Sequence, residues 1–311
     1  MIVVEHLTKT YGAKKAVDDL TFTVAPGRVT GFLGPNGSGK STTMRCMLGL
    51  DRADNGTVTF DGARYHDLKR PLTHVGSLLD AGDAHKGRTA RNHLRWIAMT
   101  HGLPVSQVDE VLHRVGMTDA AKTKVGKYSL GMRQRLGLAV ALLGDPKVVI
   151  LDEPANGLDP EGIRWTRDVM RHLADEGRSV IVSSHQLVEL SMVADDLVVI
   201  GQGKLISSGP ISHFMNQHAK TWVRVVSPEI EKLTALVVAT GATYERTSTG
   251  TDFFGVTALE VGELCAKNSI VLHELSPQTG SLEQAFLDAT DASVEYRGES
   301  TSNNTWNAPG L

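Results

Sequence analysis

The stretch GFLGPNGSGKSTT, residues 31–43, decides the fold. It matches the phosphate-loop pattern G-x-x-x-x-G-K-[ST], in which glycines let backbone N–H groups surround phosphates. RVTGFLG is an expected strand before the loop, and STTMRCMLGL after it has the apolar spacing of a helix. An ordinary glycine-rich turn is the alternative, but a strand before and a helix after favour a phosphate site. We expect that site to comprise Gly34, Pro35, Asn36, Gly37, Ser38, Gly39, Lys40, Ser41 and Thr42.

Two carboxylates follow a second apolar run, VVILDEP, residues 148–154. A buried strand would deliver Asp152 and Glu153 at its carboxyl end, where ligands of α/β sheets bind. Lys40 can then reach the β- and γ-phosphates, while Ser41 and Asp152 hold Mg²⁺. Glu153 can act as the general base or orient the attacking water. The pair could instead cap a helix, but phosphoryl transfer needs both a metal-holding carboxylate and a water-orienting group, so we favour catalysis.

The remaining pattern up to residue 217 predicts an α/β fold. VVEHL, TFTV and GTVTF, within residues 1–60, are expected short strands, and residues of about 80–145 have mostly helical spacing. KVVILDEP and RSVIVSSH are continuous apolar runs, which are typical of strands buried on both faces of a parallel sheet. The amphipathic segment between them completes a β-α-β unit.

A composition change near residue 218 marks a second domain. Residues 218–290 have the order strand, helix, strand, strand, helix, strand and a final helix, which predicts a small α+β domain. Its third helix has the sequence GSLEQAFLDAT, and the strand before it is expected at IVLHELS, residues 270–276. The polar tail 291–311 is expected to be disordered.

The composition argues against nucleic-acid-binding, disulfide-rich, zinc-binding and membrane-spanning proteins. The 311 residues are 41% hydrophobic and 22% charged, as in soluble globular proteins, and a net charge of −3 with scattered signs argues against nucleic acid as a ligand. Two distant cysteines predict neither a disulfide framework nor a zinc site. We expect no signal peptide and no membrane span, because no apolar window reaches the ~18 residues that a span needs. A membrane role would therefore require a partner that supplies the spans.

Further motifs resemble the ATP-binding cassette (ABC) family. YSLGM (128–132) stands where that family has its Leu-Ser-Gly-Gly-Gln signature, with LDEP shortly after it. NGLDP (156–160) resembles the D-loop, VSSH (182–185) the segment of the switch histidine, and TYG (10–12) the adenine-stacking aromatic. The ordered set covers about residues 1–217. It implies a P-loop NTPase ABC cassette with a RecA-like parallel sheet core, an antiparallel β subdomain and a helical subdomain at about 80–145.

The resemblance also implies roles. Two cassettes would pair head-to-tail around two ATP molecules, so a second copy of the chain is an expected partner. Tyr11 would stack on adenine. His185 would contact the γ-phosphate and help to hold the attacking water. Taken alone it would be assigned as a buried histidine satisfied by backbone, but its place in VSSH after a strand favours the functional role. The D-loop would contribute Asp159, and the residues that contact the partner's ATP in trans would be Ser129, Leu130, Gly131 and Met132.

The chain departs from the family pattern in two places. Leu130 and Met132 replace a glycine and the glutamine of the signature. Asp80, within VGSLLDAGDA, stands at about the position of a family glutamine that touches Mg²⁺ or water. An ionised aspartate accepts hydrogen bonds but cannot donate them. Asp80 can hold Mg²⁺ through water, or it is a solvated loop residue, and both readings stay open.

Within the family, the single cassette, YSLGM, Asp80 and the C-terminal extension resemble ATPase subunits of bacterial drug, antibiotic or lantibiotic exporters. Such subunits lie on the cytoplasmic face of the membrane and pair with a separate multi-span permease, which would dock on residues 80–127. The C-terminal domain would regulate, make dimer contacts or simply pack. The alternatives are a soluble ABC ATPase in cofactor assembly or on the ribosome, and an ATP-binding switch without hydrolysis, against which Lys40, Asp152, Glu153 and His185 argue.

Overall fold

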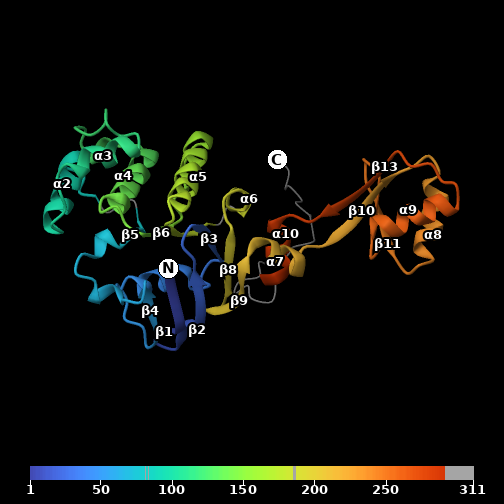
Figure 1. The fold of residues 1–311 in the computed structure, drawn as a ribbon, viewed down its shortest axis with the longest axis horizontal. Helices are drawn as coiled ribbons and strands as arrows, with labels where there is room; N and C mark the ends of the chain where they lie inside the picture. The colour runs from blue at the N-terminus through green and yellow to red at the C-terminus, as the bar shows by residue number, and fades with distance from the viewer. Residues whose placement is uncertain (81, 83, 185–186, 291–311) are drawn as a thin grey trace, which may run out of the picture. The chain divides into compact units, whose positions relative to one another are not determined.

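The computed structural model describes residues 1–80, 82, 84–184 and 187–290. Internal contacts group Met1–Gly209 in one compact unit and Pro210–Ala289 in a second (Figure 1). The predicted tail 291–311 lies outside the described residues. Among the helices described, none has both the length and the apolar character that crossing a bilayer requires.

A six-stranded sheet forms the centre of the first unit, in the order β5-β6-β7-β3-β8-β9. Pairing is parallel from β5 through β8. Nearly every residue of β6 and β7 is buried, as expected of strands covered on both faces. The strands are β3 (Arg28–Leu33), β5 (Val75–Leu78), β6 (Val148–Asp152), β7 (Ser179–Ser183), β8 (Asp196–Gly201) and β9 (Lys204–Pro210).

A separate antiparallel sheet, β2-β1-β4, packs on helix α1 (Lys40–Met47) through a shared apolar core. Its strands are β1 (Ile2–Tyr11), β2 (Lys14–Val24) and β4 (Asn55–Phe60). β1 and β2 are longer than the predicted VVEHL and TFTV. The reason is that register shifts let pairing continue past His6 and Asp19, which have positive φ angles of 50° and 59°.

The segment between β5 and β6 folds mostly into helices, as predicted from its apolar spacing. Figure 1 shows three of them, α2, α3 and α4, side by side. Polar side chains begin three helices: the side chains of Thr89, Ser129 and Asp159 accept hydrogen bonds from N–H groups of the first turn. The helices of this unit after α1 are α2 (Ala90–Thr100), α3 (Gln107–Arg114), α4 (Leu130–Leu142), α5 (Pro160–Asp175) and α6 (Leu187–Ser191), with single turns at Tyr65–Asp67, Pro71–Thr73 and Val125–Lys127.

The second unit has the predicted order of strands and helices, preceded by an additional helix, α7. Its antiparallel sheet, β11-β12-β10-β13, buries Val223, Val225 and Phe253 in an apolar core with helices α8 and α9. The last strand begins at Glu274 rather than at Ile270, because Glu274 pairs with Val226, the final residue of β10. The elements are α7 (Ile211–His218), β10 (Thr221–Val226), α8 (Ile230–Val238), β11 (Thr243–Arg246), β12 (Thr251–Phe254), α9 (Ala258–Lys267), β13 (Glu274–Thr279) and α10 (Leu282–Thr290).

Candidate active site

The phosphate loop joins the end of β3 to the start of α1, as predicted. Its glycines are required sterically at two positions. A Cβ on Gly34 would lie 2.5 Å from the Ile200 carbonyl oxygen. A Cβ on Gly39 would lie 2.3 Å from the Ala16 carbonyl oxygen, and Gly39 has a φ of 105° that favours glycine. The loop is therefore fixed by backbone packed closely around it.

Lys40, the first residue of α1, extends its ammonium group across the loop. Its Nζ donates to the carbonyl oxygens of Gly34 at 2.6 Å and Pro35 at 3.1 Å. Burial lowers the pKa of this ammonium, and the negative charges of Glu153 and Asp152 oppose that shift. A phosphate between Lys40 and the loop would give this half-buried cation a counter-charge.

Ser41 and Asp152 meet although they are far apart in sequence. The Ser41 hydroxyl donates to Asp152 Oδ2 at 2.9 Å, and the Ser183 hydroxyl donates to Asp152 Oδ1. Ser183 ends β7, the strand between β6 and β3. A hydroxyl and a carboxylate oxygen fit Mg²⁺, which takes one or two carboxylates and completes its shell with water and phosphate oxygens.

Glu153 follows β6 in a left-handed conformation with a φ of 48°. Its N–H donates to Ser183, at 3.2 Å to the carbonyl oxygen and 3.0 Å to the hydroxyl. Ser183 therefore contacts both carboxylate residues, a role that our sequence reasoning missed. Its position beside the predicted switch histidine in VSSH was the available signal. His185 itself lies outside the described residues.

A cavity of about 510 Å³ unites these groups, a size in the range of small-molecule sites. Tyr11 is 48% exposed at its edge, and its hydroxyl donates to Asp51 Oδ2 at 2.8 Å. That hydrogen bond raises the pKa of the Tyr11 hydroxyl above its ordinary value. The cavity is lined by Tyr11, Lys14, Ala16, Asn36, Gly37, Gly39, Lys40, Ser41, Thr42, Leu79, Asp152 and Glu153.

Asp80 does not line this cavity. Its Oδ1 accepts a hydrogen bond from the Gly82 N–H at 2.6 Å, and the residue lines an adjoining cavity of about 280 Å³. The two cavities share Leu79, Asp152 and Glu153. Gln134, which sequence reasoning also missed, lines the second cavity, and its buried Oε1 has no hydrogen-bond partner among the described residues.

The signature residues do not line the phosphate cavity, although Leu130 lines the adjoining 280 Å³ cavity with Asp152 and Glu153. Ser129 begins α4 and accepts from the Met132 N–H at 3.2 Å. Leu130 is 43% exposed and lies over Gly157 of the predicted D-loop, where an added Cβ would be 2.3 Å from Leu130 Cδ2. Asp159 caps α5 by accepting from the Gly162 N–H at 2.8 Å. Ser129, Leu130, Gly131 and Met132 do not line the 510 Å³ cavity of their own chain.

Known proteins resemble this chain over nearly its whole length. The ABC transporter family model matches residues 17–156, and a domain of unknown function (DUF8746) matches residues 221–283. The uncharacterized ABC transporter ATP-binding protein YhcH of Bacillus subtilis (strain 168) is 38% identical, with 95% of this chain and 97% of that protein covered. The bacitracin transport ATP-binding protein BcrA of Bacillus licheniformis is 40% identical, with 71% and 73% covered.

Solved structures agree with the fold of the first unit. A structure described as the ATP binding subunit of an ABC transporter superposes with a TM-score of 0.64 at 26% sequence identity. The match covers 70% of this chain and 92% of that one.

Proposed function

Since this chain belongs to the ABC transporter family of ATP-binding proteins, we propose that it powers export of a drug or antibiotic through a separate membrane permease. It is an ATPase of that family, and its relative BcrA is described as acting in bacitracin transport. The fold, with a parallel core sheet, an antiparallel sheet and a helical region, is the one predicted for such a cassette. We place the chain on the cytoplasmic face of the membrane, bound to that permease.

The 510 Å³ cavity can accept Mg²⁺–ATP with each group in a distinct role. Tyr11 supports adenine at the edge of the cavity, and Lys40 binds the β- and γ-phosphates. Ser41 and Asp152 hold Mg²⁺, which neutralises charge on the phosphates when it is bound. Glu153 polarises the attacking water as general base. The hydrogen bond between Ser41 and Asp152 already sets the two ligand oxygens 2.9 Å apart.

One observation carries the proposed ATP-sandwich dimer. Ser129 is exposed at the N-terminus of α4, where a helix favours anions, but it does not line the phosphate cavity of its own chain. A second copy in head-to-tail arrangement would bring its Ser129 and Gly131 to the γ-phosphate. ATP would then close the dimer, and hydrolysis would open it.

A groove beside the helical region supports permease docking. A cavity of about 320 Å³ lies between the segment after β5 and helices α2 and α4, and it is lined largely by apolar side chains. Trp96 on its wall is 50% exposed, and Met99 on the same helix is 67% exposed. Exposed apolar side chains at a hollow are typical of a protein contact. We assign this groove to an apolar cytoplasmic segment of the permease.

The test is affinity purification of the tagged chain from detergent-solubilised membranes of its host, with mass spectrometry of co-purifying proteins. We expect a stoichiometric polytopic membrane protein, which Trp96→Ala together with Met99→Ala should largely release. Leu259→Ala, at a 73% exposed position on α9, is the matched control and should release none. Recovery of a soluble partner alone, with the chain absent from membranes, would instead support an ATPase that is not coupled to transport.

A further inference from the structure

A short joint, residues 143–147, connects helix α4, which carries the signature, to strand β6, which carries Asp152. Helix α4 begins after Ser129 and ends at Leu142, and β6, which delivers Asp152, begins at Val148. The joint is tightly constrained. An added Cβ on Gly144 would lie 2.1 Å from the Leu72 carbonyl oxygen, and Asp145 adopts a positive φ of 52°. The angle at this joint decides where Ser129 stands relative to β6.

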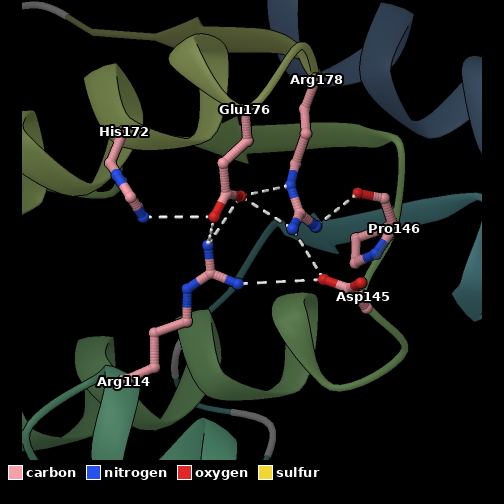
Figure 2. Close-up of polar contacts among 6 residues, drawn as sticks. All are labelled: Arg114, Asp145, Pro146, His172, Glu176 and Arg178. Carbon is pink, nitrogen blue, oxygen red and sulfur yellow. Dashed lines mark hydrogen bonds and ion pairs between the residues drawn. The ribbon is translucent and has the colours of Figure 1, made fainter.

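Arg178, at the start of β7, holds the joint directly. Figure 2 shows its guanidinium group among three acceptors: Asp145 Oδ1 at 2.7 Å, the Pro146 carbonyl oxygen at 2.8 Å and Glu176 Oε2 at 2.8 Å. The Arg178 side chain is only 12% exposed. Partly buried, charge-assisted hydrogen bonds from one rigid guanidinium group fix both geometry and register.

Arg114 ties the helical region to the same cluster. It ends α3, and its NH2 donates to both carboxylate oxygens of Glu176, at 2.9 Å and 2.8 Å. Its NH1 lies 3.9 Å from Asp145 Oδ1, and His172 adds an Nε2 contact of 3.2 Å to Glu176 (Figure 2). The end of α3 is therefore bonded to Glu176, which follows α5, and Glu176 in turn accepts from Arg178, the residue before β7.

A second bridge lies further along α4. Arg135 donates to the Val115 carbonyl oxygen at 3.1 Å, and its guanidinium carbon lies 4.0 Å from the centroid of the Trp165 ring on α5. At the start of α4, Leu130 covers Gly157. Residues 157–178 thus contact α4 at its first residue, Leu130, and at Arg135, and they contact the joint at Asp145.

We propose that Arg114 and Arg178 are positioning residues for ATP hydrolysis, which set the angle of α4 on β6 and so place Ser129. The inference rests on the proposed function, in which Ser129 meets the ATP of a second copy. The 13 residues of α4 span about 20 Å at 1.5 Å per residue, so a rotation of about 10° at the joint would move Ser129 by about 3 Å. A displacement of that size breaks a hydrogen bond to phosphate.

The test measures position and turnover separately. Spin labels at Lys127→Cys and Asp168→Cys, both at exposed positions, report the distance between the start of α4 and α5; the native Cys46 and Cys265 are buried. With Arg114→Ala we expect a broadened or shifted distance distribution and a kcat at least tenfold lower, with unchanged ATP affinity. Arg114→Lys keeps the charge but has a single nitrogen, so it cannot contact Glu176 and Asp145 together as the two terminal nitrogens of Arg114 do. It should therefore fall between wild type and Arg114→Ala.

Arg246→Ala is the matched control, because Arg246 makes the same paired contact to both Glu231 oxygens, 2.6 Å each, in the second unit. It should change neither distance nor kcat. A wild-type distance distribution with kcat within twofold in Arg114→Ala would overturn the proposal. If Arg114→Ala does not fold, Arg114→Lys and Glu176→Gln decide by the same criteria. If the unaltered chain does not dimerise with ATP, the proposed function fails, while the label distances still decide whether Arg114 positions α4.

Discussion

Glu153 shows how single residues are set by neighbours from other strands. Its left-handed backbone costs a non-glycine residue on the order of 1–3 kcal/mol. Two hydrogen bonds from its N–H to Ser183 offset that cost and end β6 at this point. The turn leaves Glu153 lining both the phosphate cavity and the adjoining cavity. A carboxylate so placed can face water beside a bound γ-phosphate.

Replacing Glu153 by glutamine should therefore abolish turnover without abolishing binding. Glutamine keeps the size of the side chain but cannot accept a proton, and loss of a general base costs about 10²–10⁴-fold in rate. We expect Glu153→Gln to lower kcat by at least about 100-fold, with ATP affinity close to that of the wild type. Phosphate release and equilibrium nucleotide binding would measure the two quantities. Equal turnover by the two proteins would remove Glu153 from this role.

Asp80 should matter much less. Its carboxylate accepts from the Gly82 N–H within its own loop and does not line the phosphate cavity. We expect Asp80→Gln to retain ATPase activity within about tenfold, equivalent to about 1.4 kcal/mol in the barrier. Steady-state hydrolysis at saturating ATP and Mg²⁺ is the measurement. A loss of several hundredfold would assign Asp80 a specific part in metal or water binding.

The sequence predicts those site residues that lie within one local motif. Lys40 and Ser41 follow from the glycine-rich loop, and Asp152 follows from an apolar strand that ends in carboxylates. Ser183 and Gln134 could not be found in this way. Their contacts depend on strand order, which places β7 between β6 and β3, and on the packing of α4 beside the loop after β5. The spacing of neighbouring residues does not encode the place of Gln134, and for Ser183 it offers only the position two residues before the predicted switch histidine.

At the scale of helices and strands, periodicity predicted which elements form better than where they end. The helices near 90–100 and 160–175 and the buried strands β6 and β7 lie where apolar spacing placed them. Strand ends depend instead on the partner strand: β13 begins at Glu274, the residue that pairs with Val226 at the end of β10. Bulges at His6 and Asp19 likewise extend β1 and β2 through residues that resemble turns.

Helix α9 begins with a capping box that makes its stability depend on pH. Thr257 accepts from the Glu260 N–H, and the Glu260 carboxylate accepts from the Thr257 N–H at 2.7 Å and its hydroxyl at 2.9 Å. These hydrogen bonds, the backbone one first, hold the pKa of the Glu260 carboxyl below its ordinary value. A carboxyl whose pKa falls on folding stabilises the folded state above its unfolded pKa of about 4.3, and this contribution is lost as pH falls through the folded value.

We therefore expect Glu260→Gln to weaken the amide protection of the first turn of α9 at pH 7. The difference from wild type should shrink as pH falls below about 4.3, because the wild-type carboxyl then takes up its proton. Hydrogen exchange followed by mass spectrometry would measure it. Glu263→Gln, on the same helix with its carboxylate 3.7 Å from the Lys267 ammonium, is the control and should change protection little. A difference that persists unchanged to pH 3 would contradict the capping role.

At the scale of the whole molecule, one chain holds a phosphate cavity that its own Ser129 and Gly131 do not line. The phosphate cavity is lined by the loop of residues 34–42 and by β6, whereas Ser129 and Gly131 lie outside it. Leu130 of the signature lies over Gly157 and lines the adjoining cavity beside Asp152 and Glu153. A complete site would then require two copies, arranged so that each loop faces the signature of the other.

Head-to-tail pairing predicts that two different inactive chains restore each other. Lys40→Ala removes the phosphate contact of one half-site, and Ser129→Arg blocks the other half-site, so each variant alone should be inactive. In a mixed dimer one site would combine both defects, while the second would combine an intact loop with an intact signature. Half of the dimers would be mixed, each with one working site, so an equimolar mixture should regain about a quarter of wild-type ATPase activity.

The control for this mixture is a single chain that carries both substitutions, added to either variant, which should restore nothing. Such a chain contributes neither an intact phosphate loop nor an intact signature to a mixed dimer. Hydrolysis would be measured at protein concentrations at which ATP maintains the dimer. Co-purification of one variant through an affinity tag on the other would confirm that the mixed dimers form. If mixed dimers form and the mixture stays inactive, the prediction that each mixed dimer holds one independently working site is wrong.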